Sequence, residues 1–179
     1  MSQEKSVCCF CRLPRATFEC EVCSEPICRS CVLRVPEDSF LMMPEKPANL
    51  SHDKYCPRCH DEVIETAQTT YNEILERAKN VGYWAKGYRG HVPVLKKARF
   101  DISVENGLDR DDVLLRLGFK AAQEGFNGLI DGQVTSKKLR NFGYQKMTWS
   151  ARALPCKVDD EKLAREEYRE AHWRILHHR

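Results

Sequence analysis

The sequence lacks any long hydrophobic run. None of its apolar stretches is long enough to cross a bilayer, and the residues that follow Met1 are polar, unlike a secretory signal segment. These absences argue against a membrane protein and against a secreted, disulfide-bonded scaffold. We therefore expect a cytoplasmic protein whose cysteines stay reduced.

Catalytic signatures are missing as well. The sequence contains no glycine-rich phosphate loop, no His-Glu-x-x-His pair and no nucleophile elbow. No His/Asp partner motif accompanies a lone cysteine and marks it as a nucleophile. The sequence therefore predicts a protein that is not an enzyme.

Cysteine, in contrast, is abundant and unevenly placed, because nine of the ten cysteines precede His60. Eight of them form four Cys-x-x-Cys pairs: Cys8 with Cys11, Cys20 with Cys23, Cys28 with Cys31, and Cys56 with Cys59. A two-residue gap lets both sulfurs of a pair reach one metal ion, and two pairs complete a tetrahedron. We therefore predict two structural zinc ions held by these eight thiolates.

The four pairs can combine in sequence or interleaved. Only residues 24–27 separate the second pair from the third, which is a short link for folding two knuckles onto one ion. Interleaving is preferred for this reason, although ligand spacing alone leaves the sequential pairing open. The two predicted ligand sets are Cys8, Cys11, Cys28 and Cys31, and Cys20, Cys23, Cys56 and Cys59.

Two cysteines fall outside this pattern. Cys9 lies between two predicted ligands and is expected to be a bystander. Cys156 follows a Leu-Pro pair and is expected to be a buried or strand-end thiol.

Residues 20–31 carry a two-four-two cysteine spacing that resembles the centre of FYVE fingers and B-box modules, and the resemblance covers residues 6–62. It implies a small treble-clef or cross-brace fold of hairpins with one short helix, in which Ile27 packs between the metal sites. B-box modules usually end on histidines, where this chain has Cys56 and Cys59. The basic signature of lipid-binding FYVE members is absent, so phosphoinositide membranes are not expected partners.

Residues 56–59 also look like the Cys-Pro-x-Cys loop of RING ubiquitin ligases. Leu13 lies near the place where those proteins present an apolar contact to the conjugating enzyme. RING domains usually leave two residues between their fourth and fifth ligands and use a histidine, whereas this chain has four residues and only cysteine. A RING-like E3 ubiquitin ligase component is therefore an alternative function.

The composition changes after His60, where the cysteines end and a periodic apolar pattern begins. We predict four parts: a two-zinc finger at 1–62, a connecting helix and linker at 63–90, a small α+β domain at 91–158, and a charged C-terminal helix at 159–179. The predicted fold class is α+β, with the order β-α-β-β in the small domain.

Local patterns predict the elements around these boundaries. Apolar residues recur at three- and four-residue steps from Asp61 to Gly82, which favours an amphipathic helix closed by a glycine cap. Residues 92–104 are expected to form one strand region, and a second helix should begin at the acidic residues 109–112. An apolar cluster at 40–43 is either a contact surface or a cover for the zinc module.

The last part of the chain shows a second set of patterns. Residues 127–139 and 144–154 are typical of the two strands of a hairpin, and a charged helix should follow from 159 to 175. Residues 121–130 are similar to a segment of small bacterial α/β domains described as heavy-metal-binding, some of which form rings. This resemblance implies that the chain can associate with copies of itself.

The charges do not point to one partner. The formal charge is +3 with neutral cysteines. Each zinc with four thiolates carries about −2, which brings the loaded protein to about −1. A local basic excess lies beside aromatic residues, and we expect a solvated face there rather than a nucleic-acid site. Its members are Lys86, Arg89, Lys96, Lys97 and Arg99, beside Tyr83, Trp84 and Tyr88.

These observations together predict a zinc-binding, non-enzymatic protein–protein interaction or scaffold protein. Its partner is another protein, unidentified from the sequence, or a second copy of the chain. A nucleic-acid-binding zinc-finger protein is a second alternative, although we expect neither nucleic acid nor membranes as partners.

Overall fold

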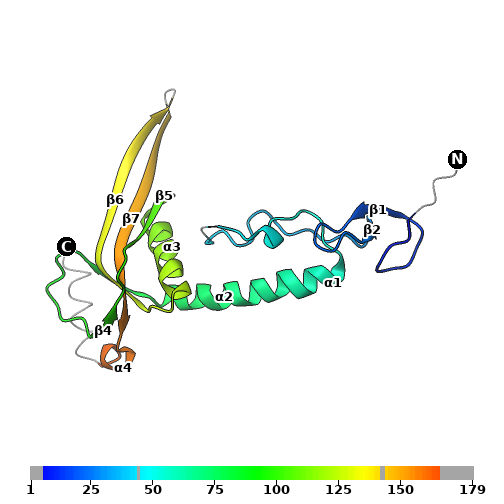
Figure 1. Ribbon diagram of the computed structural model, residues 1–179. Coiled ribbons are helices and arrows are strands. Elements are labelled where there is room, and N and C mark those ends of the chain that lie inside the picture. The colour runs from blue at the N-terminus through cyan, green and yellow to red at the C-terminus, as the bar shows by residue number, and fades with distance from the viewer. Residues whose placement is uncertain (1–5, 44, 142–143, 166–179) are drawn as a thin grey trace. The chain divides into compact units, whose positions relative to one another are not determined.

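The structure is a computed structural model that describes residues 6–43, 45–141 and 144–165 (Figure 1). It mixes helices and strands, and it divides into two compact units, Met1–Glu73 and Ile74–Arg179. The finer predicted boundaries at 62, 90 and 158 stay predictions. No helix in the described part of the chain is long and apolar enough to cross a membrane.

The first unit is built from short elements. Strands β1 (Ala16–Glu19) and β2 (Pro26–Cys28) form an antiparallel ribbon, and a bridge joins Leu33 to Tyr55. A single 3-10 turn, η1 (Ala48–Leu50), interrupts the long excursion between the third and fourth cysteine pairs. Elements this short need other constraints to hold them together.

A helical stretch begins inside the last cysteine pair. It consists of α1 (Pro57–Cys59), a π-helical segment η2 (His60–Glu65) and α2 (Thr66–Lys79). Cys56 caps its start, since its sulfur accepts the backbone N–H of Cys59, and Pro57 occupies the first helical position, where its missing N–H costs nothing. The helix therefore starts earlier than the apolar pattern from Asp61 predicted.

The second unit contains a five-stranded sheet with one helix. The strands are β3 (Gly82–Ala85), β4 (Val94–Lys97), β5 (Ile102–Gly107), β6 (Gly128–Asn141) and β7 (Tyr144–Val158). Their order is β3-β6-β7-β4, and β5 also pairs with β7. Only β3 runs parallel to its neighbour, β6; the other pairs are antiparallel.

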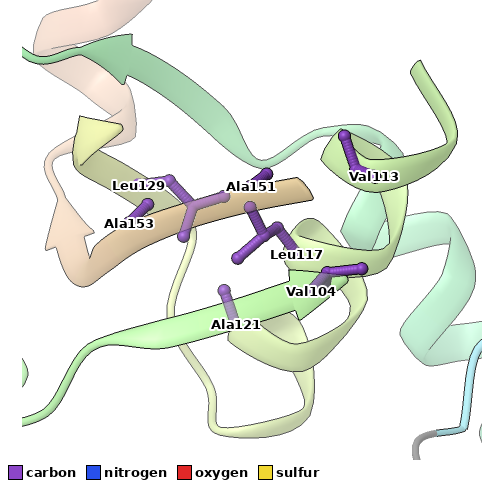
Figure 2. Packing of buried hydrophobic residues seen from close by; sticks show 7 residues of the cluster. All are labelled: Val104, Val113, Leu117, Ala121, Leu129, Ala151 and Ala153. Carbon is purple, nitrogen blue, oxygen red and sulfur yellow. The ribbon is translucent and has the colours of Figure 1, made fainter. Parts of the chain in front are cut away.

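Helix α3 (Arg110–Gln123) covers one face of this sheet. As the acidic pattern predicted, it is capped by Asp109, whose carboxylate accepts the backbone N–H of Asp112 at 2.8 Å. Its apolar side chains meet those of β5, β6 and β7 in a core that Figure 2 shows from close by. The buried members are Val104, Val113, Leu117, Ala121, Leu129, Ala151 and Ala153.

Several sequence-based predictions for this unit need correction. Gly82 does not cap the preceding helix but begins β3, where it pairs with Gly128. The region 92–104 gives β4 and the start of β5, separated by a turn. Three strands thus precede α3, where the predicted β-α-β-β order has one. The hairpin is present in β6 and β7.

The predicted C-terminal helix is described only at its start. Helix α4 spans Asp160–Leu163 and is capped by Asp159, whose carboxylate accepts the backbone N–H of Lys162. The rest of the expected helix lies outside the described residues.

Candidate metal centre

The eight paired cysteines gather into two groups of four. One group contains Cys8, Cys11, Cys28 and Cys31, and the other contains Cys20, Cys23, Cys56 and Cys59. Within each group, the four sulfurs lie within 4.8 Å of one another. The structure therefore combines the first pair with the third and the second with the fourth, as the interleaved arrangement predicts.

The sulfur spacing fits a tetrahedral metal ion. With Zn–S bonds of about 2.3 Å, the edges of a sulfur tetrahedron measure about 3.8 Å. The sulfurs of Cys11 and Cys28 lie 3.7 Å apart, and those of Cys23 and Cys56 lie 3.8 Å apart. Each group can therefore hold one ion without rearranging its backbone, and four thiolates are a ligand set that favours zinc.

Two kinds of backbone turn present the sulfurs. After each of the first two pairs, the next residue adopts a positive φ, 60° at Arg12 and 59° at Ser24, and its N–H donates back to the carbonyl of the pair's first cysteine. The fourth pair opens helix α1 instead, and at the third pair the N–H groups of Cys31 and Val32 both donate to the carbonyl of Cys28 in a turn after β2. In both types, the short loop brings the two sulfurs of a pair to the same side.

Backbone N–H groups tie the two pairs of each group together. The N–H of Cys28 donates to the sulfur of Cys8 at 3.4 Å, and the N–H of Cys56 donates to the sulfur of Cys20 at 3.3 Å. The two groups thus repeat one arrangement, in which the first cysteine of the later pair supports the first cysteine of the earlier pair.

These contacts change the acidity of the thiols. Burial alone raises the pKa of Cys8, but backbone N–H groups from Cys28, Cys11 and Phe10 outweigh it and lower the pKa from 9.0 to about 6. The same balance of burial and N–H donors lowers the pKa of Cys20 to about 7. Each group therefore contains one thiol that is poised to be a thiolate near neutral pH.

Other thiols of the two groups keep their protons more strongly, and Cys31 and Cys59 are examples. Hydrogen bonding to Cys28, together with burial, raises the pKa of Cys31 to about 12, and burial raises the pKa of Cys59. Four sulfurs this close cannot all be anionic unless a cation compensates them. The donor set therefore calls for a divalent ion in each group.

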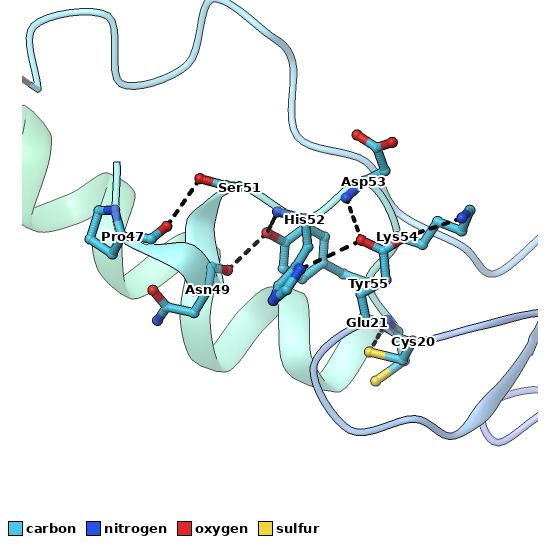
Figure 3. A network of polar contacts seen from close by, with 10 residues as sticks. Cys20, Glu21, Pro47, Asn49, Ser51, His52, Asp53, Lys54 and Tyr55 are labelled. Carbon is cyan, nitrogen blue, oxygen red and sulfur yellow. Dashed lines mark hydrogen bonds and ion pairs between the residues drawn. The ribbon is translucent and has the colours of Figure 1, made fainter. Parts of the chain in front are cut away.

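A long excursion delivers the fourth pair to its group, and Figure 3 shows what fixes it. The fully buried Tyr55 donates its hydroxyl to the carbonyl of Asn49 at 2.9 Å and accepts the backbone N–H of His52 at 3.1 Å. The Glu21 carboxylate accepts the Asp53 N–H at 2.9 Å and pairs with Lys54 at 3.1 Å. Glu21 lies between Cys20 and Cys23. Its contacts therefore hold the segment between Cys31 and Cys56 in place next to Cys20 and Cys56.

Ile27 lies where the resemblance to FYVE and B-box modules places it. It is fully buried and packs with buried cysteines from both groups. Among the buried members of this cluster, Ile27 is the only residue that is not a cysteine. The buried part of this cluster therefore consists almost entirely of cysteines, and metal ions would have to hold their sulfurs together.

The two unpaired cysteines stay outside both groups. Burial, with the nearby thiols of Cys56 and Cys8, raises the pKa of Cys9 to about 11, which keeps it a neutral thiol. Cys156 is fully buried on β7, and burial raises its pKa to about 11. Both positions agree with the expected roles.

The apolar cluster at 40–43, expected to be either a contact surface or a cover for the zinc module, is buried at one residue and exposed at another. Phe40 is buried and packs edge-on against Tyr71 of α2, with ring centres 5.3 Å apart, and the N–H of Met42 donates to the Tyr71 hydroxyl at 3.3 Å. Phe40 is thus neither a contact surface nor part of the cysteine cluster. Leu41 is exposed, at 58%, and Met42 and Met43 are half-buried, so the expected contact surface stays a prediction for Leu41.

Sequence reasoning also missed a feature beside the second group. In η2, the ligand atoms of His60, Asp61 and Glu65 lie within 4.8 Å of one another. The buried Nδ1 of His60 has no hydrogen-bond partner among the described residues. Both carboxyl-bearing residues are exposed, so this group is a weaker metal site than the cysteine groups.

Comparisons with family models, curated proteins and solved structures find no match to this chain. The resemblance to FYVE and B-box modules therefore rests on the cysteine spacing and on the interleaved grouping.

Proposed function

We propose that this chain is a zinc-binding interaction protein, whose first unit is a cross-brace module held by two structural zinc ions. The observation that carries the proposal is the completeness of both cysteine groups. A catalytic zinc keeps a coordination position for water or substrate, whereas four protein sulfurs close a tetrahedral site. The role of the metal is then to fix the surface around it.

The surface that the module fixes is apolar at the first knuckle. Val7, Phe10 and Leu13 are 49%, 62% and 45% exposed, although they flank or lie inside the Cys8–Cys11 loop. The loop closes with a hydrogen bond from the Cys8 N–H to the Leu13 carbonyl at 2.9 Å. Apolar side chains held on a rigid loop lose little conformational entropy when they bind, which favours a protein partner at this knuckle.

Metal content tests the structural part of the proposal. Protein purified without added metal should contain about two zinc ions per chain by elemental analysis. Cys8→Ala should lose at least one of them, whereas Cys9→Ala, its matched neighbour, and Cys156→Ala should keep both. A wild-type content of one zinc, or iron with visible absorption, would contradict the proposal.

Partner capture tests the recognition surface. The double variant Phe10→Ser with Leu13→Ser should lose the proteins that the wild-type chain captures from its own cells, while its zinc content stays at the wild-type level. Leu41→Ser removes an equally exposed apolar side chain elsewhere in the unit and should keep them. If both variants captured the same amount of partner, the loop around Cys8 and Cys11 would not be the contact site.

A RING-like ubiquitin ligase is the second candidate. It is supported by the interleaved grouping, by the exposed Leu13 and by the Cys-Pro-x-Cys turn, in which Pro57 starts a helix. A ubiquitin-transfer assay with a panel of conjugating enzymes separates the two candidates. Chain formation that is lost in both Leu13→Ser and Pro57→Ala would make the protein an enzyme.

A further inference from the structure

Strands β6 and β7 continue past the rest of their sheet (Figure 1). Pairing of β6 with β3 ends at Gly132, and pairing of β7 with β5 ends at Trp149. From the pair Lys137–Thr148 to the pair Asn141–Tyr144, the described strands pair only with each other. We call residues 137–141 and 144–148 the β-arm.

The β-arm leaves the unit from an anchored base. Val134 on β6 and Trp149 on β7 are half-buried and pack against the core cluster under α3. Beyond them, the side chains of Lys137, Lys138 and Lys146 are exposed. A two-stranded ribbon contributes little stability by itself. This extension therefore projects from the unit without enlarging its hydrophobic core.

The β-arm lies in a stretch without negative charge. Residues 132–158 contain six Lys or Arg and no Asp or Glu, although the whole chain has 29 basic and 26 acidic residues. The six are Lys137, Lys138, Arg140, Lys146, Arg152 and Lys157. Such a segregated charge is the electrostatic mark of a surface that binds a polyanion.

Within the described part of the chain, no ion pair neutralises the arm lysines. Arg152, below the arm, pairs with Asp101, with Nε 3.1 Å from Oδ2. Lys137, Lys138 and Lys146 take part in none of the ion pairs found among the described residues. Their charge is therefore available to a ligand.

The lysines lie on both faces of the ribbon. Lys137 and Lys138 are consecutive, so they point to opposite faces. Lys146 is two residues from Thr148, the partner of Lys137, which places Lys146 and Lys137 on one face as diagonal neighbours, about 7–8 Å apart. A ribbon that is positive on both faces suits a ligand with a negative wall on either side.

We propose that the β-arm binds double-stranded DNA by entering the major groove and pairing its lysines with phosphates. This groove is about 12 Å wide and admits a two-stranded β-ribbon. Its two walls carry phosphates, which match the two basic faces, whereas a flat membrane would meet only one face. The major groove of duplex RNA is too deep and narrow for such an entry.

Lysines on exposed strands also discourage edge-to-edge aggregation. That role explains a charged strand, but it does not require that acidic residues be absent from a stretch as long as 132–158. The inference is independent of the zinc sites, because none of the arm residues belongs to either cysteine group.

Fluorescence anisotropy with a short, mixed-sequence duplex DNA tests this inference on the zinc-loaded full chain. The triple variant Lys137→Glu, Lys138→Glu and Lys146→Glu should weaken binding by about tenfold or more at moderate salt. The slope of log affinity against log salt should become shallower by about 2–3, close to one unit for each lost phosphate contact. The Lys→Gln version of the same triple should show the same direction with a smaller loss.

The control carries the same change in net charge at exposed lysines outside the arm that also take part in none of the ion pairs found among the described residues: Lys46→Glu, Lys86→Glu and Lys96→Glu. It should change affinity by less than about threefold, and all variants should keep wild-type circular dichroism and zinc content. Equal losses in the arm and control variants, or no salt-sensitive DNA binding by the wild type, would overturn the inference. If duplex RNA, phosphatidylserine vesicles or polyglutamate bound to the arm more tightly than DNA does, that ligand and not DNA would be the one the arm recognises.

Discussion

Acid–base balance at single sulfurs decides how each cysteine group meets a metal ion. Cys8 and Cys20 receive N–H groups from the opposite pair, and both have lowered pKa values. Burial opposes the ionisation of Cys28, but hydrogen bonds with Cys31 and with the Ser30 backbone lower its pKa as well. Cys9 has the opposite balance, since burial and nearby thiols raise its pKa. Sequence spacing identifies the ligands, but only the folded backbone distinguishes the sulfurs that ionise first.

This balance predicts how the stability of the first unit depends on pH. The pKa values of Cys8 and Cys20 fall from 9.0 to about 6 and about 7 on folding, so between those values and 9 the folded unit holds fewer protons than the unfolded chain. The free energy of unfolding therefore rises with pH in this range. The contribution of these two thiolates to stability is lost as the pH falls through 7 and 6. Bound zinc acts in the same direction, because protons compete with it for the thiolates.

Zinc release on heating measures this dependence. Followed with a colorimetric chelator, the release temperature of the full chain should rise by about 5 °C or more between pH 6 and pH 8. Cys9→Ser should give the same pH dependence as the wild type. A release temperature that is flat over this range would show that the N–H contacts do not set the acidity of the ligands.

Elements show where sequence reasoning succeeds and where it stops. The cysteine grouping was predictable, because a link as short as residues 24–27 restricts which pairs can share an ion. Strand β3 was not, because its residues become a strand only by pairing with β6, far along the chain. The burial of Phe40 likewise depends on Tyr71 of α2, which no local pattern connects to it.

Packing between α2 and α3 gives a prediction at this scale. Gly118 of α3 is buried, and a Cβ atom added there would lie 2.7 Å from the backbone carbonyl oxygen of Ala78. Gly118→Ala should therefore destabilise the second unit by about 1–3 kcal/mol, although alanine is the better helix former by about 1 kcal/mol. Urea denaturation measures the change.

Gln123→Ala is the matched control, because Gln123 is exposed in the same helix and should change stability by less than about 0.5 kcal/mol. If Gly118→Ala were as stable as the control or more stable, α3 would not pack against the end of α2 as closely as the structure shows.

At the scale of the whole molecule, the two units depend on different sources of stability. In the first unit, Ile27 is the one buried member of the cysteine cluster that is not a cysteine, and other buried side chains such as Phe40 and Tyr55 lie outside that cluster. The second unit has an apolar core formed by α3, β5, β6 and β7. Zinc binding would therefore supply folding free energy to the first unit, and burial of apolar surface supplies it to the second. Removing the metal should therefore unfold the first unit and leave the second unit folded.

Hydrogen–deuterium exchange of the full chain, with and without a strong zinc chelator, tests this separation. After chelation, backbone amides of residues 8–33 and 54–60 should exchange as fast as in an unfolded chain, because their hydrogen bonds depend on the metal-held turns. Amides of residues 102–107 and 150–158 should keep their protection, since their ladder and core contain no zinc ligand. Loss of protection in both units would show that the second unit needs the zinc module to fold, and unchanged protection in the first would show that the thiol groups hold the fold without metal.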